Sequence, residues 1–354
     1  MAKQTRRPTG IAIIGTGGMA RAHARAFGSM RGVKVIGACD VLSDRASAFT
    51  KKYGIEHVYD DIDDVLDDAR VDAVCIVTPD ASHAGISIQA LGAGKHVLCE
   101  KPLALNHTDA ARMARLAKRK GVIHMVNFSY RRSGALYRAR KLVQSGALGE
   151  VKHVEASYLQ SWLVSPAWGD WRTDPKWLWR LSSRHGSLGT LGDIGVHIVD
   201  FATFPVGSLK SVYCTLRTFP KAPRNRVGEF QLDANDTAAI HAEFAGGALA
   251  SITATRWATG YINTLVLRIH GDRGSIRINL DESYDRLEAC TGPATEKAEW
   301  RTIAAARVPT IYERFARSIR SGKPADPDFE RGAEVQKVLD ACFKSHEQKA
   351  WVKV

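Results

Sequence analysis

The segment Ile11-Ala-Ile-Ile-Gly-Thr-Gly-Gly-Met-Ala20 joins a short apolar run to a glycine-rich turn. The apolar run predicts a buried strand, and the pattern Gly15-x-Gly17-x-x-Ala20 follows it directly, ahead of a helical stretch. In this setting Gly15 permits a tight turn, Gly17 lets the main chain approach a pyrophosphate, and Ala20 is small enough for the helix to pack against the strand. Free amides at the positive helix end can then bind the phosphates. The segment therefore predicts a dinucleotide-binding fold.

Short strands and helices alternate through the first third of the chain. Apolar, β-branched runs predict strands at 11–14, 33–38, 73–77, 96–99 and 122–126, and the stretches between and after them predict helices at 19–30, 44–53, 62–68, 82–93 and 108–120. Such alternation is typical of a doubly wound parallel sheet. We therefore expect an α/β Rossmann domain over residues 1–126.

The pattern changes after a predicted helix at 135–145. Longer runs of alternating polarity follow at 151–159, 237–244, 248–256, 265–270 and 274–279, and helices are predicted at 311–321 and 329–346. The alternating runs indicate an antiparallel or mixed sheet. We expect residues 127–354 to form an α+β domain for substrate binding and oligomerisation, with C-terminal helices able to pack back towards the first domain.

The composition is that of an ordinary globular protein. The 354 residues are 45% hydrophobic and 25% charged. No stretch reaches the ~20 apolar residues of a membrane span, and the opening MAKQTRRPTG lacks the apolar core of a secretory signal. The six cysteines occur singly, without the spacing of a metal site, and are expected to be reduced thiols. These features predict a cytoplasmic protein with no metal and no membrane partner.

The net charge of +13 is unevenly distributed. Residues 110–149 include ten Lys and Arg side chains and no Asp or Glu. Three interpretations stay open for this stretch: a solvated helix face, a contact between subunits, or a site for an anion. It has neither interleaved aromatic residues nor a helix-turn-helix pattern, so a nucleic-acid partner is not expected.

The predicted strand at 33–38 ends in Ala38-Cys39-Asp40. A carboxylate at this position can accept hydrogen bonds from the ribose hydroxyls of NAD, and it would repel the 2′-phosphate of NADP. The alternative is a helix-capping or turn residue. Arg45, one turn into the next helix, either pairs with a phosphate or is a solvated helix residue. NAD is the expected cofactor and NADP the less favoured one.

Two further predicted strands end in polar residues at the same edge of the sheet. Thr78, Pro79 and His83 follow one of them, and they either contact the dinucleotide or form a turn with capping residues. Glu100 and Lys101 follow the next, so an ammonium group stands at the carboxyl edge with a proline directly after it. A single lysine at this position does not by itself indicate a functional site.

Asp193 and His197 lie four residues apart, hence on one face of a predicted helix. Moving a hydride from a carbinol carbon requires the hydroxyl proton to leave, and histidine suits that base role near neutral pH. His197 is then the base, and Lys101 stabilises the negative charge that develops on the oxygen. Asp193 orients a neighbouring hydroxyl and supports the imidazolium. A contact on the helix surface is the alternative for the Asp193 and His197 pair.

Together these motifs resemble the glucose-fructose oxidoreductase/inositol dehydrogenase/rhizopine catabolism (Gfo/Idh/MocA) family of NAD(P)-dependent enzymes. The resemblance spans most of the chain and rests on an ordered set of motifs: Gly15-Thr-Gly-Gly-Met-Ala20, Thr78-Pro79, His83, Glu100-Lys101-Pro102, Asn127-Phe-Ser-Tyr-Arg131-Arg132 and Gly192-Asp193-Ile-Gly195-Val-His197-Ile-Val-Asp200. It implies a Rossmann domain and a second domain with an open, mostly antiparallel sheet. It also implies catalytic Lys101 and His197 with Asp193 beside them, and a cis Lys101–Pro102 bond.

The motifs and the resemblance together give the expected site residues. The expected cofactor-binding residues are Gly15, Thr16, Gly17, Gly18, Met19, Ala20, Asp40, Thr78, Pro79, His83, Glu100 and Lys101. The expected substrate-binding residues are Lys101, Asn127, Arg131, Trp162, Asp193 and His197. The resemblance further implies that open sheet faces pack together in a homodimer or homotetramer.

Five of the eight tryptophans fall between Trp162 and Trp179. An indole face can pack on the C–H face of a pyranose, but indoles are also common core and interface residues, so both interpretations stay open. The chain departs from the common family pattern at Arg184-His-Gly186-Ser187-Leu-Gly189, where a glycine run is frequent, and at Asp80, where Asn is frequent. These departures leave the identity of the substrate open.

The leading expectation is an NAD-dependent dehydrogenase that oxidises a secondary hydroxyl of a sugar, anhydrosugar or cyclitol. Three alternatives share the fold: an NADPH-dependent reductase of keto-sugars or other carbonyl compounds, an NAD-using glycosidase, and a non-enzymatic dinucleotide-sensing regulator. The presence of Lys101, Asp193 and His197 argues against the regulator, because a binding module needs no proton acceptor.

Overall fold

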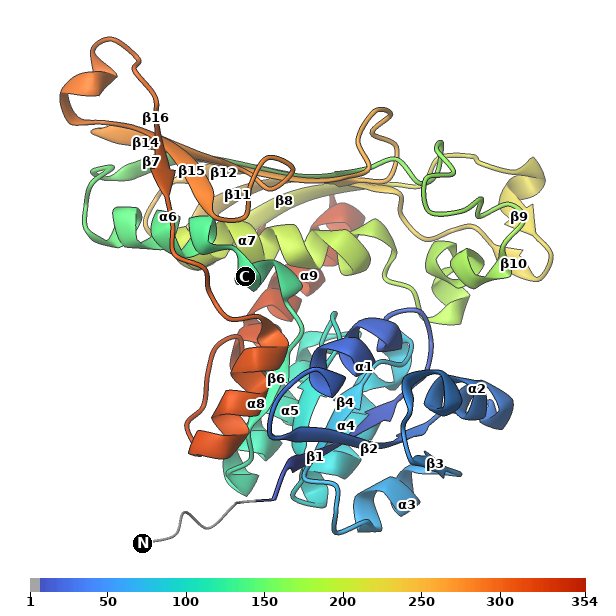
Figure 1. Cartoon of the computed structure of the whole chain (residues 1–354). Coiled ribbons are helices and arrows are strands. Elements are labelled where there is room, and N and C mark those ends of the chain that lie inside the picture. Colours follow the sequence, from blue (N-terminus) through green and yellow to red (C-terminus); the bar gives the residue numbers. More distant parts are fainter. Residues whose placement is uncertain (1–6) are drawn as a thin grey trace, which may run out of the picture. The chain divides into compact units, whose positions relative to one another are not determined.

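The computed structural model describes residues 7–354, and the chain forms two compact units. Unit 1 consists of Met1–Ser129 and Pro309–Glu334, and unit 2 consists of Tyr130–Val308 and Val335–Val354. Each unit is built around its own β-sheet, as Figure 1 shows. The chain therefore leaves unit 1, returns to it near its end, and then enters unit 2 again.

Unit 1 contains a six-stranded parallel sheet with the order β3-β2-β1-β4-β5-β6. Its strands are β1 (Thr9–Ile14), β2 (Val33–Cys39), β3 (His57–Tyr59), β4 (Ala73–Ile76), β5 (His96–Cys99) and β6 (His124–Val126). Its helices are α1 (Ala20–Gly28), α2 (Ser43–Tyr53), α3 (Ile62–Asp67), α4 (His83–Gly92), α5 (His107–Lys120) and α8 (Ile311–Ser321). The predicted doubly wound sheet is confirmed. The strand β3 was not predicted from the sequence, because three residues are too few to show an alternating pattern.

The core of unit 1 joins the first strand to a helix from near the end of the chain. All six residues of β1 are buried. Ile311 and Phe315 of α8 belong to the same apolar cluster as Phe27 of α1, and the ring centroids of Phe27 and Phe315 are 6.5 Å apart. Thr310 and Glu313 form a capping box that fixes the start of α8. The helix that follows the glycine turn is thus supported by a distant segment of the sequence.

Unit 2 contains a nine-stranded sheet with the order β16-β15-β14-β13-β7-β12-β11-β8-β17. Its strands are β7 (Val151–Gln160), β8 (Leu209–Arg217), β11 (Thr237–Phe244), β12 (Leu249–Thr255), β13 (Asn263–Gly271), β14 (Gly274–Asn279), β15 (Arg286–Thr291), β16 (Arg301–Ala304) and β17 (Val352–Lys353). Every neighbouring pair is antiparallel except β7 and β12. A separate hairpin pairs β9 (Arg226–Val227) with β10 (Phe230–Gln231). The prediction of a mostly antiparallel second sheet is confirmed.

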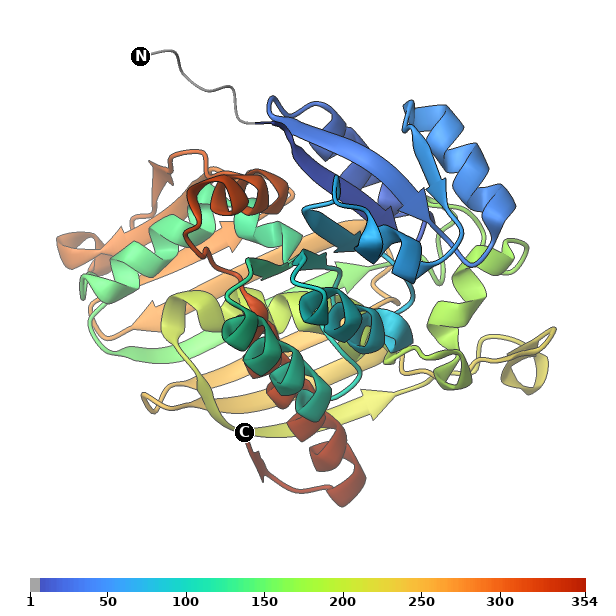
Figure 2. The ribbon, with the colours of Figure 1, turned by 90° about the horizontal axis from the view of Figure 1, so that it is seen from below.

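One face of the large sheet is covered by helices. Helices α6 (Gly134–Gln144) and α7 (Val196–Val206) lie against this face (Figure 2), and α9 (Phe329–Gln348) begins in unit 1 and continues in unit 2. Burial alternates along β7, where Ala156 and Tyr158 are buried and Ser157 between them is only partly buried. This alternation is what a sheet with one covered face produces.

The opposite face carries no covering helix among the described residues (Figure 1), and Leu249 on β12 is 57% exposed there.

With the family resemblance, this open face leads us to expect a homodimer or homotetramer. Light scattering at micromolar concentration should give the mass of two or four chains, and Leu249→Arg should lower that mass. Lys118→Glu, a charge change on the exposed side of α5, should leave the mass unchanged. A monomeric mass for the unmodified protein would count against the prediction.

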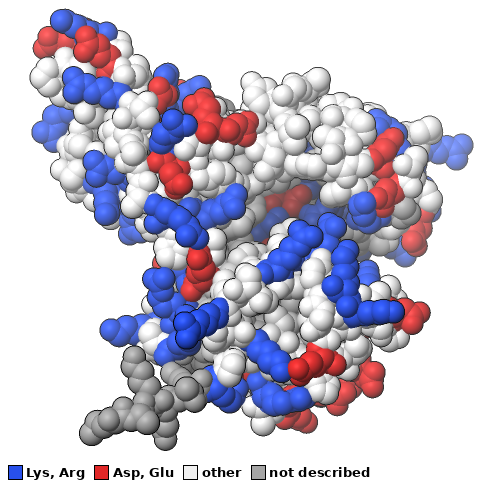
Figure 3. Space-filling view, in the orientation of Figure 1, with Lys and Arg blue, Asp and Glu red and all other residues white. Residues whose placement is uncertain are grey.

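The basic stretch at 110–149 is divided between the two units. Its first part lies on α5 in unit 1, and its second part lies in unit 2, around α6. The guanidinium carbons of Arg132 and Arg140 lie 4.2 and 4.4 Å from the ring centroids of Tyr284 and Phe204. On the face drawn in Figure 3, basic and acidic side chains are interspersed. Several of these charges therefore take part in packing within unit 2.

No helix within residues 7–354 is both long and apolar enough to cross a membrane. All six cysteines are free thiols, and each of them is buried.

Candidate functional site

The glycine turn between β1 and α1 leaves open space in front of it. Gly15 has a φ of +89°, and a Cβ there would lie 2.7 Å from the Val77 carbonyl oxygen, so both conformation and packing require glycine. A Cβ on Gly17 or Gly18 would meet no atom within 4 Å. Ala20 is fully buried at the start of α1. Space beside the free amides of a helix start fits a pyrophosphate.

Large apolar side chains are exposed around this turn and at the end of β2. Met19 is 46% exposed, Val41 is 97% exposed and Leu42 is 56% exposed. Apolar side chains that gather on a surface in this way commonly mark a binding site. The glycine turn and these side chains together fit the phosphates and the adenosine of a dinucleotide, so they are the residues that would hold NAD.

Asp40 lies at the end of β2 with its carboxylate directed at the glycine turn. Its Oδ2 accepts hydrogen bonds from the Thr16 amide at 2.7 Å and from the Thr16 hydroxyl at 2.8 Å. Arg45 forms an ion pair with Asp40, with Nη2 2.8 Å from Oδ1. Burial alone would raise the pKa of Asp40, but the bonds from Arg45 and Thr16 lower it overall. Arg45 is therefore a half-exposed residue of α2, as the solvated alternative expects, and it also pairs with Asp40.

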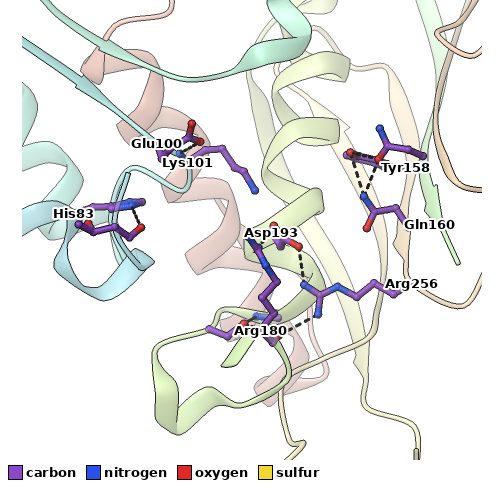
Figure 4. Close-up of polar contacts among 12 residues, drawn as sticks. His83, Glu100, Lys101, Tyr158, Gln160, Arg180, Asp193 and Arg256 are labelled. Atoms are coloured by element: carbon purple, nitrogen blue, oxygen red, sulfur yellow. Dashed lines mark hydrogen bonds and ion pairs between the residues drawn. The ribbon is translucent and has the colours of Figure 1, made fainter. Parts of the chain in front are cut away.

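His83 connects the two loops that follow β4 and β5 (Figure 4). Its Nδ1 lies 2.7 Å from the Pro102 carbonyl oxygen, and its Nε2 lies 3.0 Å from the Thr78 carbonyl oxygen. Burial opposes a charge on this ring, yet the Cys99 sulfur, Asp80 and the Pro102 carbonyl together raise the pKa of His83 to about 10. Two carbonyl partners require both ring nitrogens to donate, which agrees with a doubly protonated imidazolium.

Glu100 is held by a buried network at the end of β5. Its Oε1 accepts from Asn127 Nδ2 at 2.6 Å and lies 2.8 Å from His23 Nε2. Burial would raise the pKa of Glu100, but His23 and Asn127 lower it to about 2. Asn127 is only 1% exposed, so its amide supports Glu100 in this structure, and a substrate contact for it stays a prediction. The Lys101–Pro102 bond beside Glu100 is cis, which confirms the sequence-based expectation.

In unit 2, Asp193 lies in a wide helical turn. Leu191–Gly195 form a π-helical turn ahead of α7, and the Val196 amide donates to the Leu191 carbonyl five residues back. The predicted helix from Asp193 to His197 is thus present, but its first turn is π-helical and not α-helical. The Leu191 amide that opens this turn donates to Asn235 Oδ1 at 2.9 Å. Turns of this kind are frequent at functional sites.

Two arginines fix the Asp193 carboxylate from both sides (Figure 4). Arg180 Nη1 lies 2.8 Å from Oδ1, and Arg256 Nη2 lies 2.9 Å from Oδ2. Arg256 also donates to the Arg180 carbonyl oxygen at 3.1 Å. Burial lowers the pKa of Arg256 from its usual value, while the Asp193 charge opposes that shift. Paired with two guanidinium groups, Asp193 is stabilised as a carboxylate.

Neither arginine was predicted from the sequence as a site residue. Arg256 directly follows β12. Buried and less buried residues alternate along this strand, and Arg256 falls at a buried position of the alternation, as Ile252 and Ala254 do. A charged residue in the buried phase of a strand is the signal that could have found it. Arg180 comes directly after the tryptophan-rich segment, residues 162–179, and the residues around it show no such alternation.

The tryptophan-rich segment builds a second apolar core around these arginines. Trp162 and Trp171 are buried in one cluster with Leu163 and Leu178. The guanidinium carbon of Arg256 lies 4.9 Å from the Trp162 ring centroid, which is the arrangement of a cation–π contact. Trp162 is 5% exposed, so its packing role is evident, and its expected contact with substrate stays a prediction.

His197 lies against a closed group of hydrogen-bonded side chains. The rings of Tyr130 and His197 are nearly perpendicular, with centroids 4.9 Å apart. Asn263 Nδ2 donates to the Tyr130 hydroxyl at 3.0 Å, Tyr130 bonds to Tyr158, and the Tyr158 hydroxyl donates back to Asn263 Oδ1 at 2.7 Å. Burial raises the pKa of Tyr130 and of Tyr158, so both remain neutral phenols. These hydrogen bonds hold Tyr130, Tyr158 and Asn263 in one orientation. The three side chains together form the wall against which the His197 imidazole packs.

Arg131 forms a buried ion pair with Asp200 of α7. Arg131 Nε lies 2.6 Å from Oδ2 and Nη2 lies 2.7 Å from Oδ1. The two side chains are 0% and 4% exposed, and the Arg131 guanidinium carbon is 3.6 Å from the Phe204 ring centroid. The structure thus uses Arg131 in packing, and its expected contact with substrate stays a prediction.

Comparison with known proteins gives matches along nearly the whole chain. A family model described as an oxidoreductase family with an NAD-binding Rossmann fold matches residues 9–128, and a model of the GFO/IDH/MocA C-terminal domain matches residues 136–277. An oxidoreductase domain protein from Kribbella flavida is 33% identical, with a TM-score of 0.84 over 99% of this chain and 100% of that one.

Two curated relatives match over similar lengths. Levoglucosan dehydrogenase from Pseudarthrobacter phenanthrenivorans is 29% identical over 97% of each chain. A solved structure of a levoglucosan dehydrogenase in complex with NADH and levoglucosan is 29% identical, with a TM-score of 0.87 over 98% of this chain and 100% of that one. Myo-inositol 2-dehydrogenase from Thermotoga maritima is 27% identical over 97% of this chain and 98% of its own. Because both parts of the chain match models of one family, and relatives match along nearly all of it, the protein belongs to the Gfo/Idh/MocA family of NAD(P)-dependent oxidoreductases.

Proposed function

We propose that this protein is an NAD-dependent dehydrogenase that oxidises a secondary hydroxyl of a neutral sugar, anhydrosugar or cyclitol. The observation that carries the proposal is the Asp193 carboxylate, fixed by Arg180 and Arg256 in the turn that leads directly to His197. A carboxylate held in this way can accept hydrogen bonds from sugar hydroxyls without taking up a proton itself. Relatives named for levoglucosan and myo-inositol support a polyhydroxylated ring as the substrate.

In the proposed reaction each polar group acts on the hydroxyl that is oxidised or on its neighbour. His197 accepts the hydroxyl proton at its imidazole. Lys101, as an ammonium group, donates a hydrogen bond to the same oxygen and stabilises the negative charge that develops there. Asp193 accepts from the neighbouring hydroxyl and so sets which carbon is presented. NAD, when bound, supplies the acceptor for the hydride.

The surroundings of these groups support their roles. The wall of Tyr130, Tyr158 and Asn263 limits rotation of the His197 ring, so the imidazole does not have to be ordered during the reaction. The Glu100 network keeps the residue before Lys101 in one position, with the Lys101 amide 3.4 Å from Glu100 Oε2. These contacts would pre-organise the groups before substrate arrives.

The test is a screen of cyclitols, aldoses and anhydrosugars for NADH formation. The absorbance of NADH measures the rate. We expect turnover with at least one neutral cyclic polyol, and we expect the same compound to be inert with Asp193→Asn. Cleavage of a glycoside without net formation of NADH would show that the protein is an NAD-using glycosidase and not a dehydrogenase. NAD binding without turnover of any polyol would favour a regulator.

A further inference from the structure

Asn235, the second residue before β11, forms three hydrogen bonds with the segment that leads to Asp193. The Thr190 amide donates to the Asn235 main-chain oxygen at 2.7 Å. The Leu191 amide donates to the side-chain Oδ1 at 2.9 Å, and the side-chain Nδ2 donates to the Leu188 carbonyl oxygen at 3.1 Å. Asn235 is only 9% exposed. It therefore holds this segment through both its main chain and its side chain.

Gly189 makes room for the Asn235 side chain. Its φ is +66°, and a Cβ at this position would lie 2.5 Å from Asn235 Nδ2 and 2.7 Å from the Asn235 main-chain nitrogen. A larger residue would be strained in this conformation and would displace Asn235. Gly189 ends the stretch 184–189, in which the sequence departs from the common family pattern. Within that stretch, a glycine is thus required at the point where Asn235 packs.

Asp236, the next residue, connects this arrangement to Arg256. The Arg256 amide donates to the Asp236 carbonyl oxygen at 3.0 Å, and the Arg256 guanidinium pairs with Asp193. The Asp236 side chain is buried, with Lys221 Nζ 3.0 Å from its Oδ2. The dipeptide Asn235-Asp236 therefore contacts both the turn that carries Asp193 and the arginine that fixes its carboxylate.

The Leu191 amide needs an acceptor from outside its own helix. Leu191 is the first residue of the π-helical turn, and the amides of a first helical turn have no partner within the helix. Asn is among the residues preferred as acceptors at such a start. Asn235 supplies the acceptor from a separate segment, which fixes the turn relative to the sheet.

We propose that Asn235 is a positioning residue, which acts through this turn to set the place of the Asp193 carboxylate. It thereby sets which hydroxyl, beside the one that is oxidised, the enzyme selects. The inference rests on the proposed function, in which Asp193 accepts a hydrogen bond from that hydroxyl. A displacement of about 1 Å in a catalytic site can cost about 10²-fold in rate. A bond that holds the turn therefore has a large effect without touching the substrate.

The test compares the polyol found in the screen with its two deoxy analogues, each of which lacks one hydroxyl next to the oxidised carbon. In the unmodified protein, the analogue without the hydroxyl that Asp193 accepts should lose about tenfold or more in kcat/KM, as the loss of a charged hydrogen bond does. Asn235→Ala should lower kcat/KM for the polyol and reduce that difference to less than about threefold, because the turn no longer holds the carboxylate at the hydroxyl. Asn235→Asp should keep the difference, because Asn and Asp are about equally good acceptors at a helix start.

Hydrogen exchange measures the support of the turn without any substrate. The amides of residues 190–195 should exchange about tenfold or more faster in Asn235→Ala, since they exchange when the turn opens locally, and at a nearly unchanged rate in Asn235→Asp. Asn279→Ala is the matched control, because Asn279 Oδ1 also accepts a turn amide, that of Asp281 at 3.1 Å, at the end of β14. It should change neither the exchange of residues 190–195 nor the difference between the substrates.

Asn235→Ser, which shortens the acceptor, takes the place of Asn235→Ala where the alanine variant does not fold. An equal loss of kcat/KM for the polyol and for both analogues would overturn the proposal, because Asn235 would then serve only the stability of the fold. Loss of the difference in Asn235→Asp would also overturn it, since the acceptor at Oδ1 would not be the cause. If no polyol is turned over, the dehydrogenase assignment fails. Unchanged exchange of the turn in Asn235→Ala overturns the positioning role separately.

Discussion

Replacing either His197 or Lys101 by alanine is expected to lower kcat by about 10²- to 10⁴-fold, which is the contribution of general acid–base catalysis. His197→Ala removes the proposed proton acceptor, and Lys101→Ala removes the ammonium that stabilises the oxygen. Initial rates of NADH formation with the polyol found in the screen give kcat and KM separately. A fall in kcat and kcat/KM together marks an interaction made in the transition state.

The matched control is Lys118→Ala, which removes an exposed lysine from α5 in the same unit as Lys101. It should leave kcat unchanged. NADH should still bind to all three variants, because the glycine turn and Asp40 are untouched. If both His197→Ala and Lys101→Ala turned over at near-normal rates, the assignment of catalytic residues would be wrong.

Arg131→Met is expected to lower the free energy of unfolding by about 3–5 kcal/mol. Arg131 and Asp200 are both buried, and the substitution removes the guanidinium that neutralises the Asp200 carboxylate while keeping a side chain of similar length. Urea denaturation followed by tryptophan fluorescence measures the change. The cation–π contact with Phe204 is lost in the same variant.

The double variant Arg131→Met with Asp200→Leu separates the two effects. Removing both charges takes away the uncompensated carboxylate, so most of the lost stability should return. Arg138→Met, an exposed arginine on α6, should change the stability by less than about 0.5 kcal/mol. A loss below about 1 kcal/mol for Arg131→Met would show that the pair is not a main source of stability.

The Rossmann sheet could be predicted because its signals are local. The run that ends at Ile14, the glycines after it and Asp40 lie within a short stretch, and each residue type has a backbone or packing reason. The helix α8 could be predicted as a helix, but its docking beside α1 could not. That docking depends on Phe315 meeting Phe27, a contact between residues far apart in the sequence.

The proposed catalytic residues were predicted from the sequence, but the side chains that support them were not. The spacing of Asp193 and His197 predicted a helix. It did not predict the π-helical turn, whose first amide, that of Leu191, donates a hydrogen bond to Asn235. Nor did the sequence indicate that Arg180 and Arg256 meet at one carboxylate, because they lie on different elements. Pairings of this kind arise only when strands and loops are assembled, so periodicity does not reveal them.

The buried thiols have a practical consequence for measuring the distance between the two units in solution. Thiol reagents react with thiolates, and burial raises the pKa of Cys39 to about 11 and that of Cys75 well above its usual value. The native cysteines should therefore stay unlabelled at neutral pH. Cysteines introduced at Lys118 in unit 1 and at Lys141 of α6 in unit 2, both exposed, would accept a fluorescent donor and acceptor without a cysteine-free background. Energy transfer between the dyes would then report the separation of the two units in solution, with and without NAD.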